Sequence, residues 1–289
     1  MKKNFLISTG GSGGHVIPAT ILYDHLSKEN NILISIDKRG LKYLNNSLYK
    51  FKIVNTPKLN NYLLLPINFI LIIFLTIKSF LLLKNENIEK VFSTGGYMSL
   101  PLILAARILR LDIYLIEPNQ ILGRANKFFL KFCKKIFCYS DDVKNFPQKL
   151  KNKKIVIYPL VKKDIYEKSL FNKETKKFTI LIVGGSQGAK IFDQRLKDSI
   201  VRISKKNSIK VIHQTNEKNI SYLKNYYNDN NIENIIFSFN KNFSEILVNS
   251  DLCITRAGAS TLAELSLLNK PFIAVPLPSS KDNHQLENA

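Results

Sequence analysis

The sequence predicts an α/β protein with two doubly wound domains, and three observations support this. The 289 residues, at roughly 150 per domain, give about two domains. Short β-branched runs alternate with longer amphipathic stretches, which is typical of parallel sheets made from βαβ units. A run of strand, glycine loop and helix opens the chain, and the same succession begins again after residue 177.

Eleven short runs rich in β-branched residues are predicted as strands. They cover residues 5–8, 32–36, 90–93, 113–116, 135–138, 154–157, 179–183, 210–213, 234–237, 252–255 and 272–275. Helices are expected between most of them, for example over residues 18–27 and 189–204.

The domain boundary is expected within residues 158–177, a stretch that is rich in charge and Asn and contains Pro159. This gives domains 1–160 and 161–289. Ligands bind beyond the carboxyl ends of the strands in such sheets, so two domains facing each other would form a cleft between them.

Composition excludes several classes of protein. Hydrophobic residues make up 45 % of the chain, enough for large cores, so wholesale disorder is excluded. Twelve Gly, ten Pro and three Cys exclude collagen-like, low-complexity and disulfide-scaffold proteins. Cys133, Cys138 and Cys253 are odd in number and lack a His cluster, which favours buried, reduced thiols in a cytosolic protein over a zinc site.

The net charge is +21, from 43 Lys and Arg against 22 Asp and Glu. An anionic membrane, an anionic substrate and nucleic acid are candidate causes, and so is a composition rich in Lys and Asn. The charge is scattered without an RNA-binding motif or an aromatic platform, which argues against nucleic acid.

Residues 62–83 form an apolar stretch long enough to cross a membrane. At about 100° per residue, Asn68, Thr76, Lys78 and Ser79 fall on one side of a helix. A single span would also place the glycine loops before and after it in opposite compartments. We therefore expect, in order of preference, a helix partly buried and partly docked on a membrane surface, a buried crossover helix, and a true span.

The first glycine loop, residues 9–15, lies between a predicted strand and a helix. Val16 stands where the third glycine of a G-x-G-x-x-G fingerprint belongs. Asp37, after the second strand, has the position of a ribose-binding acid but does not restore that spacing. The loop therefore argues against a dinucleotide-dependent oxidoreductase.

The second loop, residues 184–190, nearly matches a phosphate-binding P-loop. Ala189 replaces its last glycine and Ile191 its Mg²⁺-binding Ser or Thr, which argues against an ATPase or GTPase. Two further clusters, residues 95–99 and 256–261, also follow strands. Each loop alone is equally well explained as a tight turn, but four loops at strand ends in two domains favour ligand binding.

Six sequence blocks together resemble one enzyme family. They are GGSGGHVIPA (10–19), GGYMSLP (95–101), EPNQILGRAN (117–126), GGSQGAK (184–190), RAGASTLAE (256–264) and KDNHQLENA (281–289). Almost end to end, the chain resembles the MurG family of peptidoglycan glycosyltransferases, in glycosyltransferase family 28. The resemblance implies a GT-B fold, with two Rossmann-like domains around a cleft and no cofactor or catalytic metal.

The resemblance also implies the reaction. N-acetylglucosamine would pass, with inversion, from UDP-N-acetylglucosamine to the C4 hydroxyl of the lipid-linked muramoyl-pentapeptide acceptor, lipid I. Domain 1–160 would bind the acceptor and the membrane, and domain 161–289 the UDP-sugar. Family members continue for several tens of residues past the position of Ala289, so the second domain is expected to be incomplete.

The resemblance assigns roles to residues of the blocks. His15 would be the general base, a role that suits a group with a pKa near neutrality, although a loop histidine that only orients the backbone is the alternative. Donor-binding residues would be Ser12, Gly13, Gly14, Asn119, Lys162, Ser186, Ala259, Ser260, Thr261, Leu262, Ala263, Glu264 and Gln285. Of these, Glu264 would bind the ribose hydroxyls, and Lys162 stands where the family usually has Arg.

Other positions are open or depart from the family. Arg256 would either neutralise phosphate or pair structurally. Ile116 replaces a usual His, and Gln120 and Leu100 replace usual glycines, which bears on acceptor contacts more than on donor contacts. Backbone N–H groups of the 184–189 and 256–261 loops would stabilise the departing UDP.

The expected location is the cytoplasmic face of the inner membrane, as a peripheral protein. The apolar segment and Lys58, Lys84 and Lys90 near it would dock on anionic headgroups of the inner leaflet. Other cell-wall synthesis proteins are further expected partners, and nucleic acid is not. Two alternatives stay open: another GT-B lipid glycosyltransferase, and an inactive, truncated binding protein.

Overall fold

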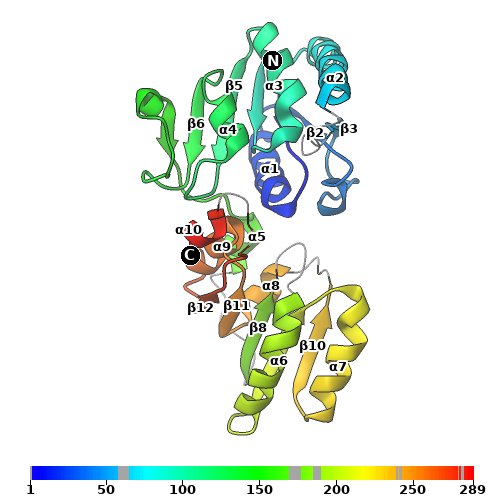
Figure 1. Ribbon diagram of the computed structural model, residues 1–289, viewed down its shortest axis with the longest axis vertical. Helices are drawn as coiled ribbons and strands as arrows, with labels where there is room; N and C mark the ends of the chain where they lie inside the picture. The colour runs from blue at the N-terminus through cyan, green and yellow to red at the C-terminus, as the bar shows by residue number, and fades with distance from the viewer. Residues whose placement is uncertain are drawn as a thin grey trace. The chain divides into compact units, whose positions relative to one another are not determined.

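The computed structural model describes most of the chain, and two compact units, Met1–Leu160 and Val161–Ala289, divide it. Each unit contains one parallel sheet with helices packed on it (Figure 1). The described residues are 2–57, 65–168, 177–184, 190–238, 240, 243–278, 280 and 283–289, with only the backbone described for Leu65 and Lys168.

The first unit holds a seven-stranded parallel sheet in the order β3-β2-β1-β4-β5-β6-β7. Its strands are β1 Asn4–Ser8, β2 Asn31–Ile36, β3 Phe51–Ile53, β4 Lys90–Ser93, β5 Asp112–Glu117, β6 Lys135–Cys138 and β7 Lys154–Val156. Its helices are α1 Gly13–Leu26, α2 Leu65–Asn85, α3 Leu100–Ile108 and α4 Arg124–Phe129, with 3-10 turns η1 Leu41–Tyr43, η3 Tyr97–Ser99 and η4 Gln148–Lys153.

The second unit holds a five-stranded parallel sheet in the order β10-β9-β8-β11-β12. Its strands are β8 Phe178–Val183, β9 Ile209–Gln214, β10 Glu233–Phe237, β11 Leu252–Thr255 and β12 Phe272–Ala274. Its helices are α5 Lys163–Lys168, α6 Lys190–Ser204, α7 Ile220–Asp229, α8 Phe243–Val248, α9 Ala259–Leu267 and α10 His284–Asn288, with the 3-10 turn η5 Glu217–Asn219. Helices α6 and α7 lie side by side along one face of the sheet (Figure 1).

Both sheets are covered on their two faces, which confirms the predicted doubly wound architecture. In β1, Leu6 belongs to one hydrophobic core while Phe5 and Ile7 belong to the other. In β8, Ile180 and Leu181 likewise lie in different cores. Because both faces are buried, these strands are continuous apolar runs rather than alternating ones.

All eleven predicted strands are confirmed to within one residue at each end. The strand β3 was not predicted, because it has three residues at the sheet edge, and Lys52 and Ile53 are exposed. The predicted helix over residues 189–204 is confirmed from Lys190, and Ala189 lies outside the described residues.

The predicted start of the first helix at Pro18 is wrong. Helix α1 begins at Gly13, and the N–H groups of His15 and Val16 donate to the Ser12 carbonyl at 3.1 Å each. Proline favours the first helical turn because it lacks an N–H group, so it marked the start in the sequence. Pro18 instead lies inside the helix. The earlier start places two glycines and His15 in the first turn of α1.

The strand order reverses once in each sheet. In the first unit the chain leaves β1 for β2 on one side and later returns to β4 on the other, and β8 has the same place between β9 and β11 in the second unit. At such a reversal the loops after the two central strands diverge, and a crevice opens at their carboxyl ends. The four glycine loops identified in the sequence follow β1, β4, β8 and β11.

Helix α2 turns an apolar face outward. Asn68 and Ser79 are buried and Lys78 is exposed, so most of the side that the sequence marks as polar faces the protein. Exposed hydrophobic residues cover the outer face: Ile67, Phe69, Ile70, Leu71, Ile73, Phe74, Ile77 and Leu81. By length and hydropathy α2 could cross a membrane, with 28 % of its apolar window buried. It packs on α3 and joins β3 to β4 of one sheet, so a span would separate two strands of the same sheet.

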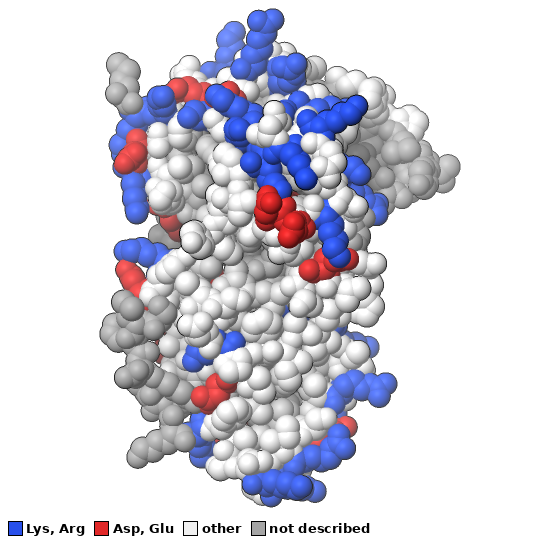
Figure 2. Space-filling model, turned by 90° about the vertical axis from the view of Figure 1, so that its left-hand side faces the viewer, with Lys and Arg blue, Asp and Glu red and all other residues white. Residues whose placement is uncertain are grey.

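Basic residues gather on one face of the first unit. Figure 2 shows Lys and Arg concentrated over the part that carries β6, β7 and η4. Part of this charge is paired, because Lys134 lies 2.9 Å from a carboxylate oxygen of Asp112 and Lys154 contacts Asp141. The Lys134–Asp112 pair is exposed, and such pairs stabilise a fold only weakly.

A buried polar network fixes the start of α6, directly after the second glycine loop. The carboxylate of Asp193 accepts hydrogen bonds from the Thr215 hydroxyl (2.6 Å) and the Asn219 amide (2.8 Å), and it faces the His213 Nε2 at 3.3 Å. The His213 Nδ1 lies 3.0 Å from the Tyr227 hydroxyl oxygen. Burial alone would raise the pKa of Asp193, but these hydrogen bonds outweigh burial and lower that pKa below its ordinary value.

Replacing His213 with alanine is expected to destabilise the protein, because it opens a cavity and leaves the buried Asp193 carboxylate short of a partner. We expect the free energy of unfolding, measured by urea denaturation, to fall by about 3 kcal/mol. The matched control is Tyr222→Phe on α7, where the side chain is exposed and the change should stay within about 0.5 kcal/mol. An equal effect of the two variants would contradict a stabilising role for the network.

Candidate active site

The two glycine loops of the first unit lie at the strand reversal, after β1 and after β4. Gly10 and Gly11 have φ values of 147° and 76°, and Gly95 and Gly96 have 87° and 83°. Residues with a Cβ atom rarely adopt these conformations. A Cβ atom on Gly96 would also lie 2.2 Å from the Met98 sulfur. Glycine at these positions therefore lets the backbone turn sharply near the amino terminus of α1.

His15 is held at this point in a defined tautomer. Its Nδ1 lies 2.7 Å from the carbonyl oxygen of Thr94, the residue that follows β4. A carbonyl can only accept, so Nδ1 carries the proton, and Nε2 of the neutral ring carries the lone pair. A Cβ atom on Gly96 would lie 3.6 Å from that Nε2, so the 95–99 loop passes closely beside the ring. The ring is thus oriented as a proton acceptor at Nε2.

The other predicted residues of this loop lie around His15. Ser12 is the N-cap of α1, without a capping hydrogen bond from its side chain, and Gly13 and Gly14 form the first residues of the helix. The backbone N–H groups at such a terminus favour a negatively charged ligand.

Glu117, the last residue of β5, organises the loop that carries Asn119. Its Oε1 accepts from the Asn119 side-chain amide at 2.9 Å, and its Oε2 accepts from Gly123 N and Asn126 Nδ2 at 2.9 and 3.0 Å. Glu117 is 2 % exposed. Gly95 lies against Asn126, since a Cβ atom there would be 3.2 Å from the Asn126 Nδ2. Glu117 therefore holds Asn119 by a hydrogen bond, and the 95–99 loop packs against Asn126 of the same assembly.

In the second unit, the six residues predicted as a nucleotide loop all lie on helix α9, from Ala259 to Glu264. Gly258 is its N-cap and provides no side-chain cap. Ser260 and Thr261 lie in the first turn, and the Ser260 hydroxyl is buried without a hydrogen-bond partner among the described residues. The first turn of α9 thus presents backbone N–H groups and two hydroxyls.

Glu264 stands one turn further along the same helix, together with the buried Leu262 and the half-buried Ala263. Burial raises the pKa of Glu264 to about 7, and the nearby charge of Lys162 opposes that rise. Glu264 is 6 % exposed. A carboxyl in this state accepts hydrogen bonds from a polyol readily once it ionises.

Two predicted residues make contacts within the fold. The Gln285 amide oxygen accepts from Leu277 N at 2.8 Å, which fixes the segment after β12. Arg256 donates to the carbonyl oxygens of Val275 and Pro276 at 3.1 and 3.0 Å and lies 4.9 Å from the centre of the Phe192 ring. Arg256 thus makes structural contacts, while its role toward phosphate stays a prediction.

The predicted site residues form two groups, one in each unit. The first unit carries His15, Ser12, Gly13, Gly14 and Asn119. The second carries Lys162, Gln285 and the residues of α9. Ser186 and its glycine loop lie outside the described residues.

Three contributors to the site were not assigned from the sequence. Thr94 acts through its carbonyl, which no side-chain pattern reveals. Glu117 and Asp37 are buried carboxylates at the carboxyl ends of β5 and β2. A charged residue that ends an apolar strand is the signal that could have drawn attention to them, because buried carboxylates need hydrogen-bond donors.

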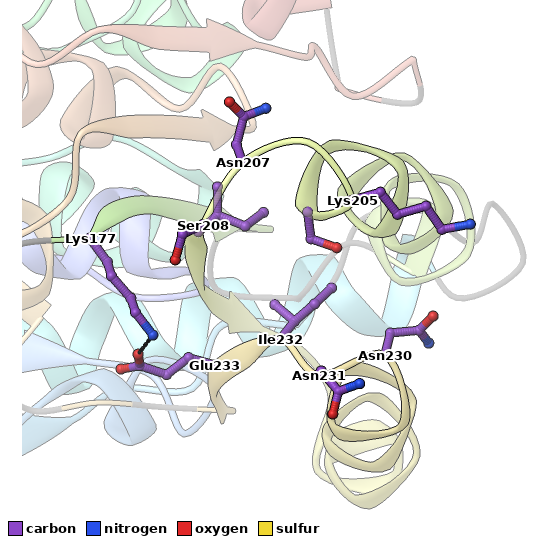
Figure 3. A pocket seen from close by; sticks show the side chains of 10 residues that line it. Lys177, Lys205, Asn207, Ser208, Asn230, Asn231, Ile232 and Glu233 are labelled. Carbon is purple, nitrogen blue, oxygen red and sulfur yellow. Dashed lines mark hydrogen bonds and ion pairs between the residues drawn. The ribbon is translucent and has the colours of Figure 1, made fainter.

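A hollow of about 270 Å³ lies elsewhere, at the opposite edge of the second sheet (Figure 3). Lys177, Ser208 and Glu233, at the amino ends of β8, β9 and β10, line it. Glu233 pairs with Lys177 at 2.9 Å and with Lys210 at 3.0 Å, so this hollow is an ion-paired surface depression away from the glycine loops. Within the described ranges, His, Cys, Asp and Glu form no group of three or more that could hold a metal ion.

Comparison with known proteins places both units in one family. The glycosyltransferase family 28 N-terminal domain matches residues 5–138, and the glycosyltransferase family 28 C-terminal domain matches residues 179–289. A crystal structure of MurG from Acinetobacter baumannii shares the fold, with a TM-score of 0.74 at 24 % identity over 99 % of this chain and 82 % of that one.

Two curated relatives carry the same name, UDP-N-acetylglucosamine--N-acetylmuramyl-(pentapeptide) pyrophosphoryl-undecaprenol N-acetylglucosamine transferase. The one from Pelagibacter ubique is 51 % identical over 100 % of this chain and 82 % of its own length. The one from Rickettsia bellii is 36 % identical over 100 % of this chain and 83 % of its own length. The chain therefore belongs to glycosyltransferase family 28, in its MurG branch.

Proposed function

We propose that this chain transfers N-acetylglucosamine from UDP-N-acetylglucosamine to the C4 hydroxyl of a muramoyl-pentapeptide linked by pyrophosphate to undecaprenol. The names of the relatives supply the substrates. The observation in this chain that carries the proposal is the hydrogen bond from His15 Nδ1 to the Thr94 carbonyl. It leaves Nε2 as a proton acceptor beside two glycine loops at a strand reversal.

In the proposed reaction, His15 Nε2 takes the proton of the acceptor hydroxyl as its oxygen attacks C1 of the sugar. The bond from C1 to the UDP oxygen breaks, and the electron pair leaves with UDP. A single displacement of this kind inverts the anomeric centre. The first unit would bind the acceptor. Its Asn119, held by Glu117, would contact the donor sugar.

The second unit would bind the donor. Backbone N–H groups and the Ser260 and Thr261 hydroxyls at the start of α9 suit a diphosphate, and they would stabilise the charge that develops on UDP. Glu264 would accept hydrogen bonds from the ribose hydroxyls. Lys162, whose charge acts on Glu264, and Gln285, which fixes the segment after β12, would complete the donor site. Ser186 is proposed for the uridine side on the family pattern alone.

The outward apolar face of α2 is proposed as the membrane contact of a peripheral protein. Lys78, whose ammonium lies 4.6 Å from the centre of the Phe74 ring, and Lys84 are exposed on this helix and suit anionic headgroups. Lys90 instead lies over the rings of Phe5 and Tyr114, and Lys58 lies outside the described residues. On this basis we propose that the protein works at the inner leaflet, where it would reach a lipid-linked acceptor.

Replacing His15 with alanine should lower the turnover for transfer to lipid I by about 10²–10⁴-fold, because the base is lost. The affinity for UDP-N-acetylglucosamine, measured by calorimetry, should stay unchanged, because the His15 side chain is not among the residues predicted to bind the donor. His25→Ala, at an exposed position near the end of the same helix, is the control and should retain turnover. Full turnover in His15→Ala would remove His15 from the base role.

Donor affinity should rise between about pH 6 and pH 8, because the raised pKa of Glu264 makes its carboxyl ionise in that range and the ionised form accepts the ribose hydroxyls. Binding should also release a proton, seen as a dependence of the calorimetric heat on the buffer. The diphosphate of UDP-N-acetylglucosamine does not titrate in this range.

The variant Glu264→Gln should bind the donor about tenfold more weakly at pH 8 and lose most of this pH dependence. The pH dependence of the stability of the ligand-free protein provides a second test of Glu264. A carboxyl with a raised folded-state pKa costs stability as pH rises from about 4.3 to about 7, and Glu264→Gln should lack that loss. A donor affinity that is flat with pH in the unaltered chain would contradict ribose binding by Glu264.

The double variant Phe69→Ser and Phe74→Ser should weaken binding to vesicles that contain anionic lipid by about tenfold or more, since two exposed rings are lost from the docking face. Sedimentation with vesicles measures this directly. Ile203→Ser, an exposed apolar residue on α6, is the control and should bind as the unaltered chain does. Equal binding by the double variant would place the membrane contact elsewhere.

A further inference from the structure

Asp37 is a buried carboxylate that the proposed mechanism does not use. It follows β2 and is 2 % exposed. Its Oδ1 accepts from the backbone N–H groups of Gly11 (2.7 Å) and Gly40 (3.0 Å), and its Oδ2 accepts from the Arg39 Nε at 2.6 Å. Both oxygens are therefore engaged within the protein, which also explains why this acid does not serve as a ribose ligand.

The first glycine loop packs directly on this carboxylate. A Cβ atom on Gly10 would lie 2.4 Å from the Asp37 Oδ1, and one on Gly40 would lie 2.9 Å from the Gly10 Cα. The loop and the turn after β2 are thus in contact over two glycines, with the Gly11 N–H pointing at the carboxylate. Gly11 is followed by Ser12, the N-cap of the helix whose first turn carries His15.

Arg39 extends the contact to the 95–99 glycine loop. Its guanidinium carbon lies 5.1 Å from the centre of the Tyr97 ring. Tyr97 follows Gly96 and begins η3. A guanidinium over an aromatic face is attracted by the ring, and its orientation here is set by the bond to Asp37. Asp37 is therefore linked to one loop directly and to the other through Arg39.

We propose that Asp37 is a positioning residue for sugar transfer. Its Oδ1 holds the loop that leads to His15. Its Oδ2 holds Arg39 against Tyr97 and so fixes the 95–99 loop. It does not touch the reacting atoms. This inference rests on the proposed function, since both loops belong to the unit to which we assign the acceptor. Small displacements of a base cost large factors in rate, so the effect is expected in the kinetics as well as in stability.

The two oxygens can be separated by mutation. Asp37→Asn can keep one oxygen toward Gly11 and Gly40, but it turns an amide group, which cannot accept a hydrogen bond, toward Arg39. Arg39→Ala removes the same link from the other side. Asp37→Ala removes both links. The matched control is Asp112→Asn, which breaks an exposed ion pair with Lys134 at the amino end of β5, in the same sheet.

We expect Asp37→Asn and Arg39→Ala to raise the KM for the lipid acceptor about three- to tenfold with little change in kcat, and their double variant to resemble either one. Asp37→Ala should also lower kcat by about tenfold or more. Asp112→Asn should have unaltered kinetics. An Asp37→Ala protein with the kinetics of the unaltered chain, per folded molecule, would overturn the proposal.

A readout without substrate separates this inference from the proposed function. Amide hydrogen exchange at Gly11 should accelerate at least tenfold in Asp37→Ala and stay close to the unaltered rate in Asp37→Asn. Gly40 is a weaker reporter, because its N–H also donates to the Asp37 backbone carbonyl at 3.0 Å. If the unaltered chain transfers no sugar to lipid I, the proposed function and the kinetic part of this inference fail together, while the exchange data still decide whether Asp37 holds the loop. Unchanged exchange in Asp37→Ala would overturn the loop-holding role whatever the activity.

Discussion

The first unit depends on hydrogen bonds that tie the carboxyl end of β1 to that of β4. The Thr94 hydroxyl donates to the Thr9 hydroxyl at 2.9 Å, and the Ser8 and Ser93 hydroxyls both meet that of Ser99 at 3.0 Å. These groups are buried, so leaving any of them without a partner would be costly. They hold the 9–15 and 95–99 loops in fixed positions relative to each other. The hydrogen bond from His15 to the Thr94 carbonyl depends on this arrangement.

The two units use one topology for different chemistry. Each sheet reverses its strand order beside its first strand, and each places glycine loops at that reversal. The first unit puts a histidine of fixed tautomer there, with buried carboxylates bracing the loops around it. The second puts a helix terminus rich in N–H groups there, with the buried Glu264 one turn further along. One arrangement suits proton transfer from an acceptor, and the other suits a nucleotide diphosphate.

The sequence was sufficient for the fold class and for every strand except the short edge strand β3, because buried parallel strands are continuous apolar runs between glycine loops. It misplaced the start of α1, since Pro18 marks a first turn by local preference while the tertiary structure begins the helix at Gly13. It assigned His15 by chemistry and family pattern. It did not reveal the hydrogen-bonding roles of Thr94, Glu117 and Asp37, because hydrogen bonds between loops distant in sequence depend on sheet order, which the local pattern does not contain.

The central claim is that the Thr94 carbonyl holds His15 with its proton on Nδ1 and its lone pair on Nε2. Nitrogen NMR of histidine labelled with ¹⁵N on the ring tests this directly, with the His15 signals assigned by their loss in a variant that lacks the residue. The account predicts that the neutral His15 ring is protonated at Nδ1 and not at Nε2. A neutral ring protonated at Nε2 would contradict it, because the base would then have no lone pair on the nitrogen beside the glycine loops.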